Sequence, residues 1–349
     1  MKKLITLSLI AAIFFGCLKD EPEVDPALEF MPIQLTSFNM DFEPKLSPDK
    51  KNIVFLSMRF TYDPYVAAVH FELWTMNRYG EQLRRLIKRE DMPEGFEIST
   101  FWWSVNSDYV TVLLTSRFSN NGKSELVKVS LAGEKTILHS FDFSMENLSY
   151  SPDGKKTAFM IQGLVSPNGN PSYNLYSANL GFTDTVLIDK GLIGEFDWAK
   201  DSKTIIYSLY DWPNENFDLW KIQADATGKT RFTETPEDEY NFRYSKTENA
   251  IVYSSNNKVY ISATDKFAPR LVVENARIPR WIPNRKLILF FSEQSAGEKF
   301  WTESWIADLD GNVIRKIAEG EPSSVSFVET GDYYVYSASG NIWMDYLPE

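Results

Sequence analysis

The sequence predicts an all-β protein, a seven-bladed β-propeller of four-stranded antiparallel blades. Three observations support this class. A ten-residue phrase occurs seven times, its copies are about one blade apart, and short runs rich in β-branched and aromatic residues follow each copy. Seven copies favour seven blades over six or eight. The 349 residues fit one large all-β domain, and 43% hydrophobic residues can build its core.

The first residues of the chain are predicted to be a targeting signal. Two lysines precede an apolar run over 4–15, which would make ~18 Å of helix, too short for a hydrocarbon layer of ~30 Å. Residues 1–16 are therefore interpreted as a signal peptide. The small Gly16 before Cys17, the only cysteine, resembles the lipobox of bacterial lipoproteins, which implies that Cys17 is acylated. The alternative is an ordinary secretory peptide with an incidental cysteine.

Residues 17–30 are predicted to be a solvated tether after the lipidated cysteine, because they are acidic, contain proline and have no apolar period. The segment Lys19-Asp20-Glu21 is similar to the export signal that sends Bacteroidota lipoproteins to the outside of the outer membrane. We therefore expect a protein attached to the outer membrane by its lipid and facing the cell exterior. The alternative is an anchor that faces the periplasm.

The repeated phrase describes a tight β-hairpin. An aromatic residue usually ends one strand, a polar turn follows, and an alternating strand returns. The fourth position is often Asp or Asn, which caps the turn, and Gly154 supplies a residue that tolerates positive φ. We expect the first-position aromatics, such as Trp281, to lie between neighbouring blades. The copies span 46–55, 103–112, 150–159, 198–207, 244–253, 281–290 and 327–336.

Two further strands are predicted after most copies. The third strands are expected at 71–76, 125–130, 173–178, 217–222, 257–262, 303–308 and 341–346. The fourth strands are expected at 85–88, 135–140, 185–189, 229–233, 270–274 and 313–318. The seventh copy has no room for a fourth strand before Glu349. Residues 33–38 resemble the segment that begins at Ile137, so we expect them to supply the missing strand and close the ring.

The hairpin phrase and the run that follows it resemble the TolB-like propeller repeat, a relative of the WD repeat. The best matches are 150–159, 305–317 and 73–86. The resemblance implies a propeller over residues 31–349. The TolB protein itself has six blades and a separate N-terminal domain, so this chain departs from it, and a role in the Tol system is not implied.

The connections between second and third strands are predicted to form the binding face. The first turns are short and polar, whereas the segments 58–70, 117–123, 163–172, 209–216 and 293–300 are long and uneven. Aromatic platforms beside carboxylates and amides suit sugar rings or extended peptides. The candidate binding residues are Phe60, Tyr62, Tyr65, Phe118, Tyr210, Trp212, Phe300 and Trp301.

Composition and motifs disfavour several kinds of function. A net charge of −12 argues against a nucleic-acid partner. One Cys and two His cannot form a disulfide framework or a Cys/His zinc cage, and no metal or cofactor is predicted. The segment 308–312 suggests a hairpin turn rather than a calcium loop. His70 and His139 are expected to be structural or solvated.

The sequence therefore predicts a lipid-anchored binding or assembly module without catalytic activity, whose partner is a protein, a glycan or a peptide. The alternative is a carbohydrate-active hydrolase or lyase on the same face, which would need a pair of carboxylates. The candidates for that pair are Asp63, Asp211, Glu215, Glu293 and Glu298.

Overall fold

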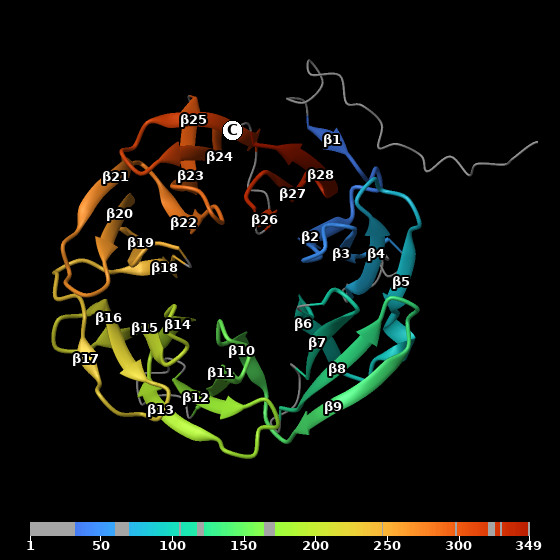
Figure 1. Cartoon of the computed structure of the whole chain (residues 1–349), viewed down its shortest axis with the longest axis horizontal. Coiled ribbons are helices and arrows are strands. Elements are labelled where there is room, and N and C mark those ends of the chain that lie inside the picture. The colour runs from blue at the N-terminus through green and yellow to red at the C-terminus, as the bar shows by residue number, and fades with distance from the viewer. Residues whose placement is uncertain are drawn as a thin grey trace, which may run out of the picture.

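The computed structural model describes residues 32–59, 70–104, 106–116, 122–163, 172–245, 247–296, 299–319, 325–328 and 330–347, except for the side chains of residues 296, 299, 300 and 319. These residues form seven four-stranded antiparallel sheets, which stand side by side in a ring (Figure 1). One short 3-10 helix, Arg89–Asp91, is the only helix among the described residues. The predicted seven-bladed β-propeller is confirmed.

Six blades are formed by strands consecutive in sequence, blade seven takes its outer strand from the N-terminal side of the chain, and the first strand of each blade is the innermost (Figure 1). Blade one comprises β2 (Asp41–Leu46), β3 (Asn52–Ser57), β4 (Glu72–Asn77) and β5 (Arg84–Ile87). Blade two comprises β6 (Phe96–Trp103), β7 (Tyr109–Ser116), β8 (Ser124–Ser130) and β9 (Lys135–Phe141). Blade three comprises β10 (Met145–Tyr150), β11 (Lys156–Gln162), β12 (Tyr173–Asn179) and β13 (Val186–Gly191).

The remaining blades follow the same order. Blade four comprises β14 (Ile193–Trp198), β15 (Thr204–Asp211), β16 (Asn216–Gln223) and β17 (Thr230–Arg231). Blade five comprises β18 (Tyr240–Tyr244), β19 (Ala250–Ser255), β20 (Lys258–Ala263) and β21 (Arg270–Glu274). Blade six comprises β22 (Arg277–Trp281), β23 (Leu287–Ala296), β24 (Lys299–Asp308) and β25 (Val313–Glu319). Blade seven comprises β26 (Val325–Phe327), β27 (Tyr333–Ala338), β28 (Asn341–Tyr346) and β1 (Ile33–Gln34).

The N-terminal strand closes the ring, as predicted. β1 pairs with β28, with Ile33 opposite Met344. The strand is shorter than the predicted 33–38, because the contacts after Gln34 become irregular: the Leu35 amide donates to the Ile342 carbonyl at 2.8 Å, and the Ile342 amide donates to Thr36 Oγ1 at 3.0 Å. The first and last of the described strands therefore share one sheet.

The repeated phrase forms the predicted hairpin between the first and second strands. In the third copy, Asp153 Oδ1 accepts hydrogen bonds from the Ser151 hydroxyl at 2.7 Å and the Lys155 amide at 3.1 Å. The fifth position has a positive φ in five copies, at Lys50, Ser107, Gly154, Ser202 and Gly331. At Gly331 a glycine is needed, because a Cβ there would lie 2.2 Å from the Pro283 carbonyl oxygen.

Hydrophobic clusters join each blade to the next. Among the described residues there are seven such clusters, and the first-position residue of the later blade belongs to each or packs against it. In three interfaces its indole N–H also donates to a carbonyl of the previous blade: Trp103 to Lys45 at 2.8 Å, Trp198 to Ser149 at 3.3 Å, and Trp281 to Arg243 at 2.9 Å. The first-position aromatics therefore lie between blades, as predicted.

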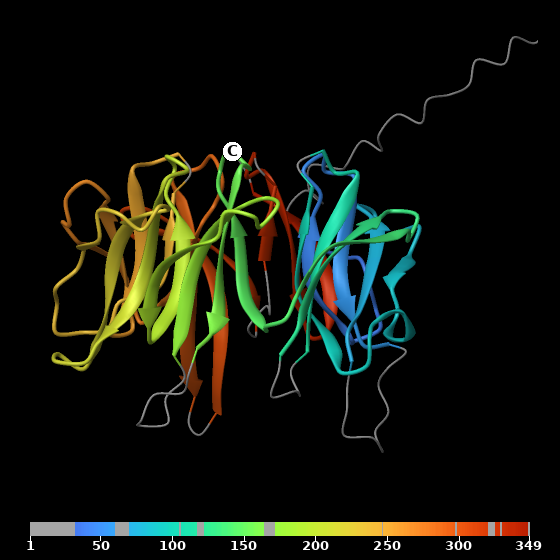
Figure 2. The same ribbon diagram turned by 90° about the horizontal axis from the view of Figure 1, so that it is seen from below.

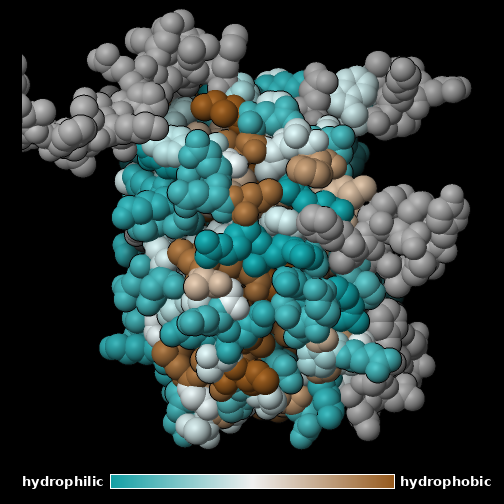
Figure 3. Space-filling view, turned by 90° about the vertical axis from the view of Figure 1, so that its right-hand side faces the viewer, coloured by the Kyte–Doolittle hydropathy of each residue, from teal (hydrophilic) through white to brown (hydrophobic). Residues whose placement is uncertain are grey.

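The ring has two faces and an outer wall. In the side view, the long β23–β24 hairpin points to the lower face, which carries the connections between second and third strands (Figure 2). The wall on the side of β1 and β5 shows apolar patches among hydrophilic side chains (Figure 3). Exposed apolar residues on outer strands include Ile33 of β1 and Ile137 and Leu138 of β9. We call the lower face the long-loop face.

Candidate functional site

The structure places only part of the predicted binding face. Five of the predicted functional residues lie outside the described part of the chain: Cys17, Phe60, Tyr62, Tyr65 and Phe118. Phe300 belongs to β24, but its side chain is not described. Tyr210 lies on β15, Trp212 follows that strand, and Trp301 lies on β24. The candidate site is therefore built from the described residues of blades four and six.

Two of the predicted long connections are wrong. In blade four the strands continue until Asp211 pairs with Asn216, and in blade six they continue until Ala296 pairs with Lys299. The reason is that residues at these ends still find cross-strand partners, such as Tyr210 opposite Phe217. Trp301 therefore lies on a paired strand, opposite Gln294, rather than in a loop.

Three aromatic rings meet at the end of the blade-four hairpin. The ring centroid of Tyr210 lies 4.8 Å from that of Trp212 and 5.1 Å from that of Phe217, both with the edge toward a face. Edge-to-face pairs add ~0.5–1.5 kcal/mol beyond the area they bury. Trp212 is nevertheless 47% exposed. The indole is thus held in place by its neighbours while it presents surface to solvent. We call these three residues the aromatic cluster.

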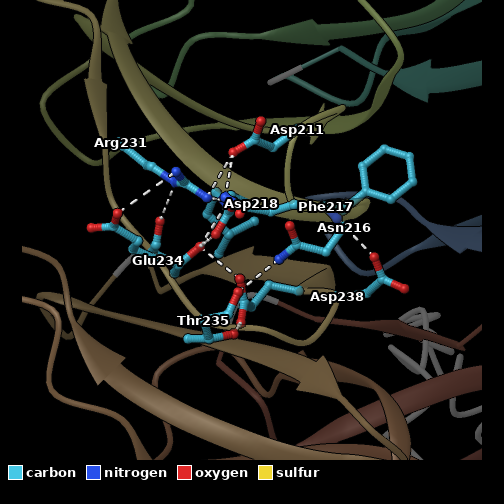
Figure 4. Close-up of polar contacts among 12 residues, drawn as sticks. Asp211, Asn216, Phe217, Asp218, Arg231, Glu234, Thr235 and Asp238 are labelled. Atoms are coloured by element: carbon cyan, nitrogen blue, oxygen red, sulfur yellow. Dashed lines mark hydrogen bonds and ion pairs between the residues drawn. The ribbon is translucent and has the colours of Figure 1, made fainter.

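An ionic network supports this hairpin (Figure 4). Arg231 of β17 forms ion pairs with Asp218 and, at 3.0 Å, with Asp211 Oδ2. The Phe217 amide donates to Asp238 Oδ1 at 2.7 Å, and Asn216 Nδ2 donates to the Thr235 carbonyl at 2.8 Å. The segment between blades four and five is therefore fastened to β16 at Asn216 and at Phe217, a member of the aromatic cluster.

Two buried carboxylates of this network share one hydroxyl. Thr233 Oγ1 lies 3.1 Å from Asp218 Oδ1 and 2.7 Å from Glu239 Oε2, and it accepts a hydrogen bond from the Leu219 amide at 2.8 Å. A threonine hydroxyl has one hydrogen, so it can donate to only one of the two carboxylates. When Glu239 is protonated it can donate to Thr233, which leaves the threonine hydrogen for Asp218. Burial raises the pKa of Glu239 to about 7.

The raised pKa predicts a pH-dependent stability. The folded pKa of Glu239 is about 7, and the unfolded pKa is ~4.3. Between these values the folded state binds more protons, so the free energy of unfolding falls as pH rises through this window, by up to ~3 kcal/mol. Urea denaturation between about pH 5 and pH 8 measures this fall, which Glu239→Gln should largely remove. Exposed Glu94 is the matched control, and Glu94→Gln should behave as the wild type; an unchanged slope in Glu239→Gln would contradict the prediction.

The same kind of ion pair recurs in other blades. Glu72 and Arg85 in blade one, Asp218 and Arg231 in blade four, and Glu303 and Lys316 in blade six each join the third strand to the fourth. In all three the carboxylate precedes the cation by 13 residues. These pairs were not predicted from the sequence, although their common spacing of 13 residues is visible in it. A contact repeated in three blades belongs to the scaffold rather than to one reactive site.

The described carboxylates predicted for a hydrolase are divided between two blades, with Asp211 and Glu215 in one turn of blade four and Glu293 in blade six. Asp63 and Glu298 lie outside the described ranges. Asp211 is paired with Arg231 in blade four, whereas Glu293 is paired with Arg277 in blade six at 3.1 Å. Asp218 is 0% and Glu239 1% exposed. A substrate cannot reach these last two without opening the network.

The histidines and the predicted turn motif have structural surroundings. The ring of His139 on β9 packs against Phe141 at 4.5 Å, and His70 lies 3.9 Å from Glu97. Asp308 Oδ1 accepts from the amides of Asp310 and Asn312 at 2.9 and 2.8 Å, which confirms a hairpin turn there.

Within the described ranges, no three His, Cys, Asp or Glu side chains form a group that could hold a metal ion. In the same ranges, none of the helical structure has the length and apolar character needed to span a membrane.

Comparisons with known proteins identify the fold. No protein-family model and no curated protein matches the sequence. The chain is similar to oligogalacturonate lyase from Vibrio parahaemolyticus, with 13% identity and a TM-score of 0.67 over 93% of this chain and 96% of that one. It is also similar to TolB from Acinetobacter baumannii, with 18% identity and a TM-score of 0.50 over 78% of this chain and 65% of that one. At these identities the likeness shows the β-propeller fold.

Proposed function

We propose that the protein is a lipid-anchored outer-membrane module that binds a ligand through its long-loop face, without catalysing a reaction. The observation that supports this most is Trp212, which is 47% exposed while its ring packs edge to face with Tyr210. An exposed indole on a fixed support is a low-entropy contact surface. The nearby carboxylates Asp211 and Asp218 are both paired with Arg231, which suits a rigid platform better than a reaction centre.

The chemistry of the cluster favours a sugar ring or an extended peptide as ligand. Trp212 offers an apolar face for stacking, and the neighbouring Asp211, Asn214 and Glu215 offer acceptors and an amide. Asn214 Nδ2 already donates to Asp211 Oδ2 at 2.9 Å, so the polar edge of the site is ordered before any ligand binds. Trp301 in blade six, 38% exposed, supplies a second indole on the same face.

Substitution of Trp212 tests the proposed face. Trp212→Ala should weaken binding by ~1–3 kcal/mol and leave the melting temperature nearly unchanged, because the side chain is half exposed. Tyr62→Ala tests the part of the face outside the described residues in the same way. Ligands can be found on a glycan array or by pull-down from cell surfaces, and affinities then follow by calorimetry. Lys155→Ala, on the opposite face, is the control; loss of binding in this variant alone would place the site on the short-turn face.

The proposed anchor has its own test. Several acyl chains on Cys17 would give stable membrane retention, since each buried CH₂ contributes ~0.8 kcal/mol and one chain alone binds only marginally. Cys17→Ser should therefore leave the protein unprocessed or release it from the membrane fraction. Fractionation and intact mass measure both effects. A Cys17→Ser protein that is processed and still membrane-bound would refute lipidation at this residue. Protease accessibility on whole cells then separates an exterior from a periplasmic location.

A second candidate function is a lyase acting on an acidic polysaccharide. It is supported by the likeness to oligogalacturonate lyase over nearly the whole of both chains. One oligogalacturonate lyase structure contains manganese, but the described residues of this chain contain no suitable group of metal ligands, so they do not fit that ion and no step is derived through it. Incubation with oligogalacturonate, followed by absorbance of an unsaturated product, tests this candidate. Formation of that product would replace the binding proposal.

A further inference from the structure

Equivalent residues of the seven inner strands surround the axis of the ring (Figure 1). In every blade, the residue that precedes the first position of the repeated ten-residue phrase is partly exposed. The residue one place earlier in the chain is buried in six of the seven blades. We call the partly exposed residues the axial positions. They are Lys45, Trp102, Ser149, Asp197, Arg243, Arg280 and Ser326.

Three of the axial positions hold cations, and they are grouped on one side. Arg243, Arg280 and Lys45 come from blades five, six and one, and blade seven between the last two contributes only Ser326. The positive charge of Arg280 lowers the pKa of Lys45, and the positive charge of Arg243 lowers the pKa of Arg280, so the cations repel one another. We call these three residues the axial cation group. It is unexpected in a chain with a net charge of −12.

Two carboxylates accompany the cations. Glu195 forms an ion pair with Arg243 at 2.7 Å. The negative charge of Glu43 raises the pKa of both Lys45 and Arg280. Asp197 is also near, but burial raises the pKa of its carboxyl, and it accepts a hydrogen bond from the Tyr244 amide at 3.0 Å. The two carboxylates Glu43 and Glu195 offset part of the positive charge of the three cations, so the group suits a singly charged anion better than a multiply charged one.

The cations keep unused hydrogen-bonding capacity. Arg280 Nε is buried and has no hydrogen-bond partner among the described residues. Lys45 Nζ donates to the Phe101 carbonyl at 2.6 Å, although an ammonium has three hydrogens to donate. Burial lowers the pKa of the Arg280 guanidinium. Burial also lowers the pKa of Lys45, to about 8, and the positive charge of Arg280 acts in the same direction. Buried polar groups are ordinarily paired, so an unpaired guanidinium donor needs an explanation.

The backbone is strained at the same three strands. The inner strands β6, β10 and β14 have a bulge as well as β2, β18 and β22. Only in β2, β18 and β22, among the described parts of the inner strands, does a residue with positive φ lie two residues before the axial position: Glu43 at 50°, Asn241 at 52° and Ile278 at 52°. A left-handed β-branched residue such as Ile278 costs stability, and such backbone strain clusters at functional sites.

We propose that the axial cation group binds a small ligand through a single carboxylate, which Arg280 holds in a bidentate contact. A guanidinium matches the planar carboxylate geometry, and the Arg243 side chain, one member of the group, is 37% exposed. A doubly charged phosphate would be repelled by Glu43 and Glu195 more strongly than a single carboxylate would. The proposal does not depend on the long-loop face.

Galacturonate and galactose test the proposal, because they differ only in the carboxylate. Calorimetric titration should show binding of galacturonate and little of galactose or inorganic phosphate. Arg280→Gln should weaken galacturonate binding by ~10–100-fold, since charged hydrogen bonds are lost. Lys45→Met should weaken it in the same direction, and Trp212→Ala should not change it. Equal affinity for galactose, unchanged affinity in Arg280→Gln, or no binding of galacturonate to the wild type would each overturn the proposal.

The stability of the unliganded protein provides a second readout. If Arg280 serves a ligand, Arg280→Met should melt at the wild-type temperature or above, because an incompletely paired, desolvated charge is removed. If Arg280 serves the fold, the same variant should melt at a clearly lower temperature, and the proposal fails. Should Arg280→Met not fold, that result also counts against a ligand role, and Lys45→Met remains for the titration.

Discussion

Deletion of residues 31–40 is expected to abolish the cooperative unfolding of the ring and to promote aggregation. The deletion removes β1 and exposes the edge of β28 from Asn341 onward. It also removes Leu35, which packs against the cluster between blades seven and one, and the contact of Asn39 with Asn341 at 2.6 Å. An unpaired, partly apolar strand edge recruits other chains. Thermal melting with light scattering measures both effects.

Two controls separate ring closure from mere truncation. A chain that begins at residue 31 keeps β1 and should melt as the full mature protein does. Gly340→Ala keeps every residue but places a Cβ 2.2 Å from the Asn39 carbonyl oxygen, so it should displace the closing segment. Gly154→Ala is the matched control, because its φ of 67° resembles the 69° of Gly340 but no atom lies within 4 Å. If the 31–40 deletion melts unchanged, the N-terminal strand does not hold the ring.

The blades could be predicted from sequence because their information is local. Each hairpin is specified within ten residues by a polar turn and an aromatic first position, as the contacts of Asp153 and the position of Trp281 show. The closing strand required one further observation, the similarity of residues 33–38 to the segment at Ile137. Its pairing with β28 follows because a propeller blade needs four strands.

The candidate site could be predicted only in part, because its contacts join residues distant in sequence. Length alone suggested a loop at 209–216, but the cross-strand pairing of Tyr210 with Phe217 extends the hairpin. The sharing of Thr233 by Asp218 and Glu239 depends on how the next blade approaches. The axial cation group is visible in sequence only after the copies are aligned at the residue before the first position.

Truncation of a first-position aromatic tests how the blades are joined. Trp281→Ala should lower the free energy of unfolding by ~3–5 kcal/mol, because a cavity forms between blades five and six. The indole packs there against a cluster that includes Val252 and Phe290, and its N–H bond to the Arg243 carbonyl, 2.9 Å long, is lost as well. Chemical denaturation monitored by fluorescence measures the change.

Two variants show which part of Trp281 matters. Trp281→Phe keeps most of the packing and loses the N–H donor, so it should cost ~1–2 kcal/mol, the value of one hydrogen bond and a small volume change. Trp301→Ala removes an indole from the same blade that is 38% exposed and should cost ~1 kcal/mol or less. If Trp281→Ala and Trp301→Ala unfold at the same denaturant concentration, the first-position residue does not stabilise the interface. Because Trp281 also fixes the backbone of Arg243, a confirmed effect would link blade packing to the position of the axial cations.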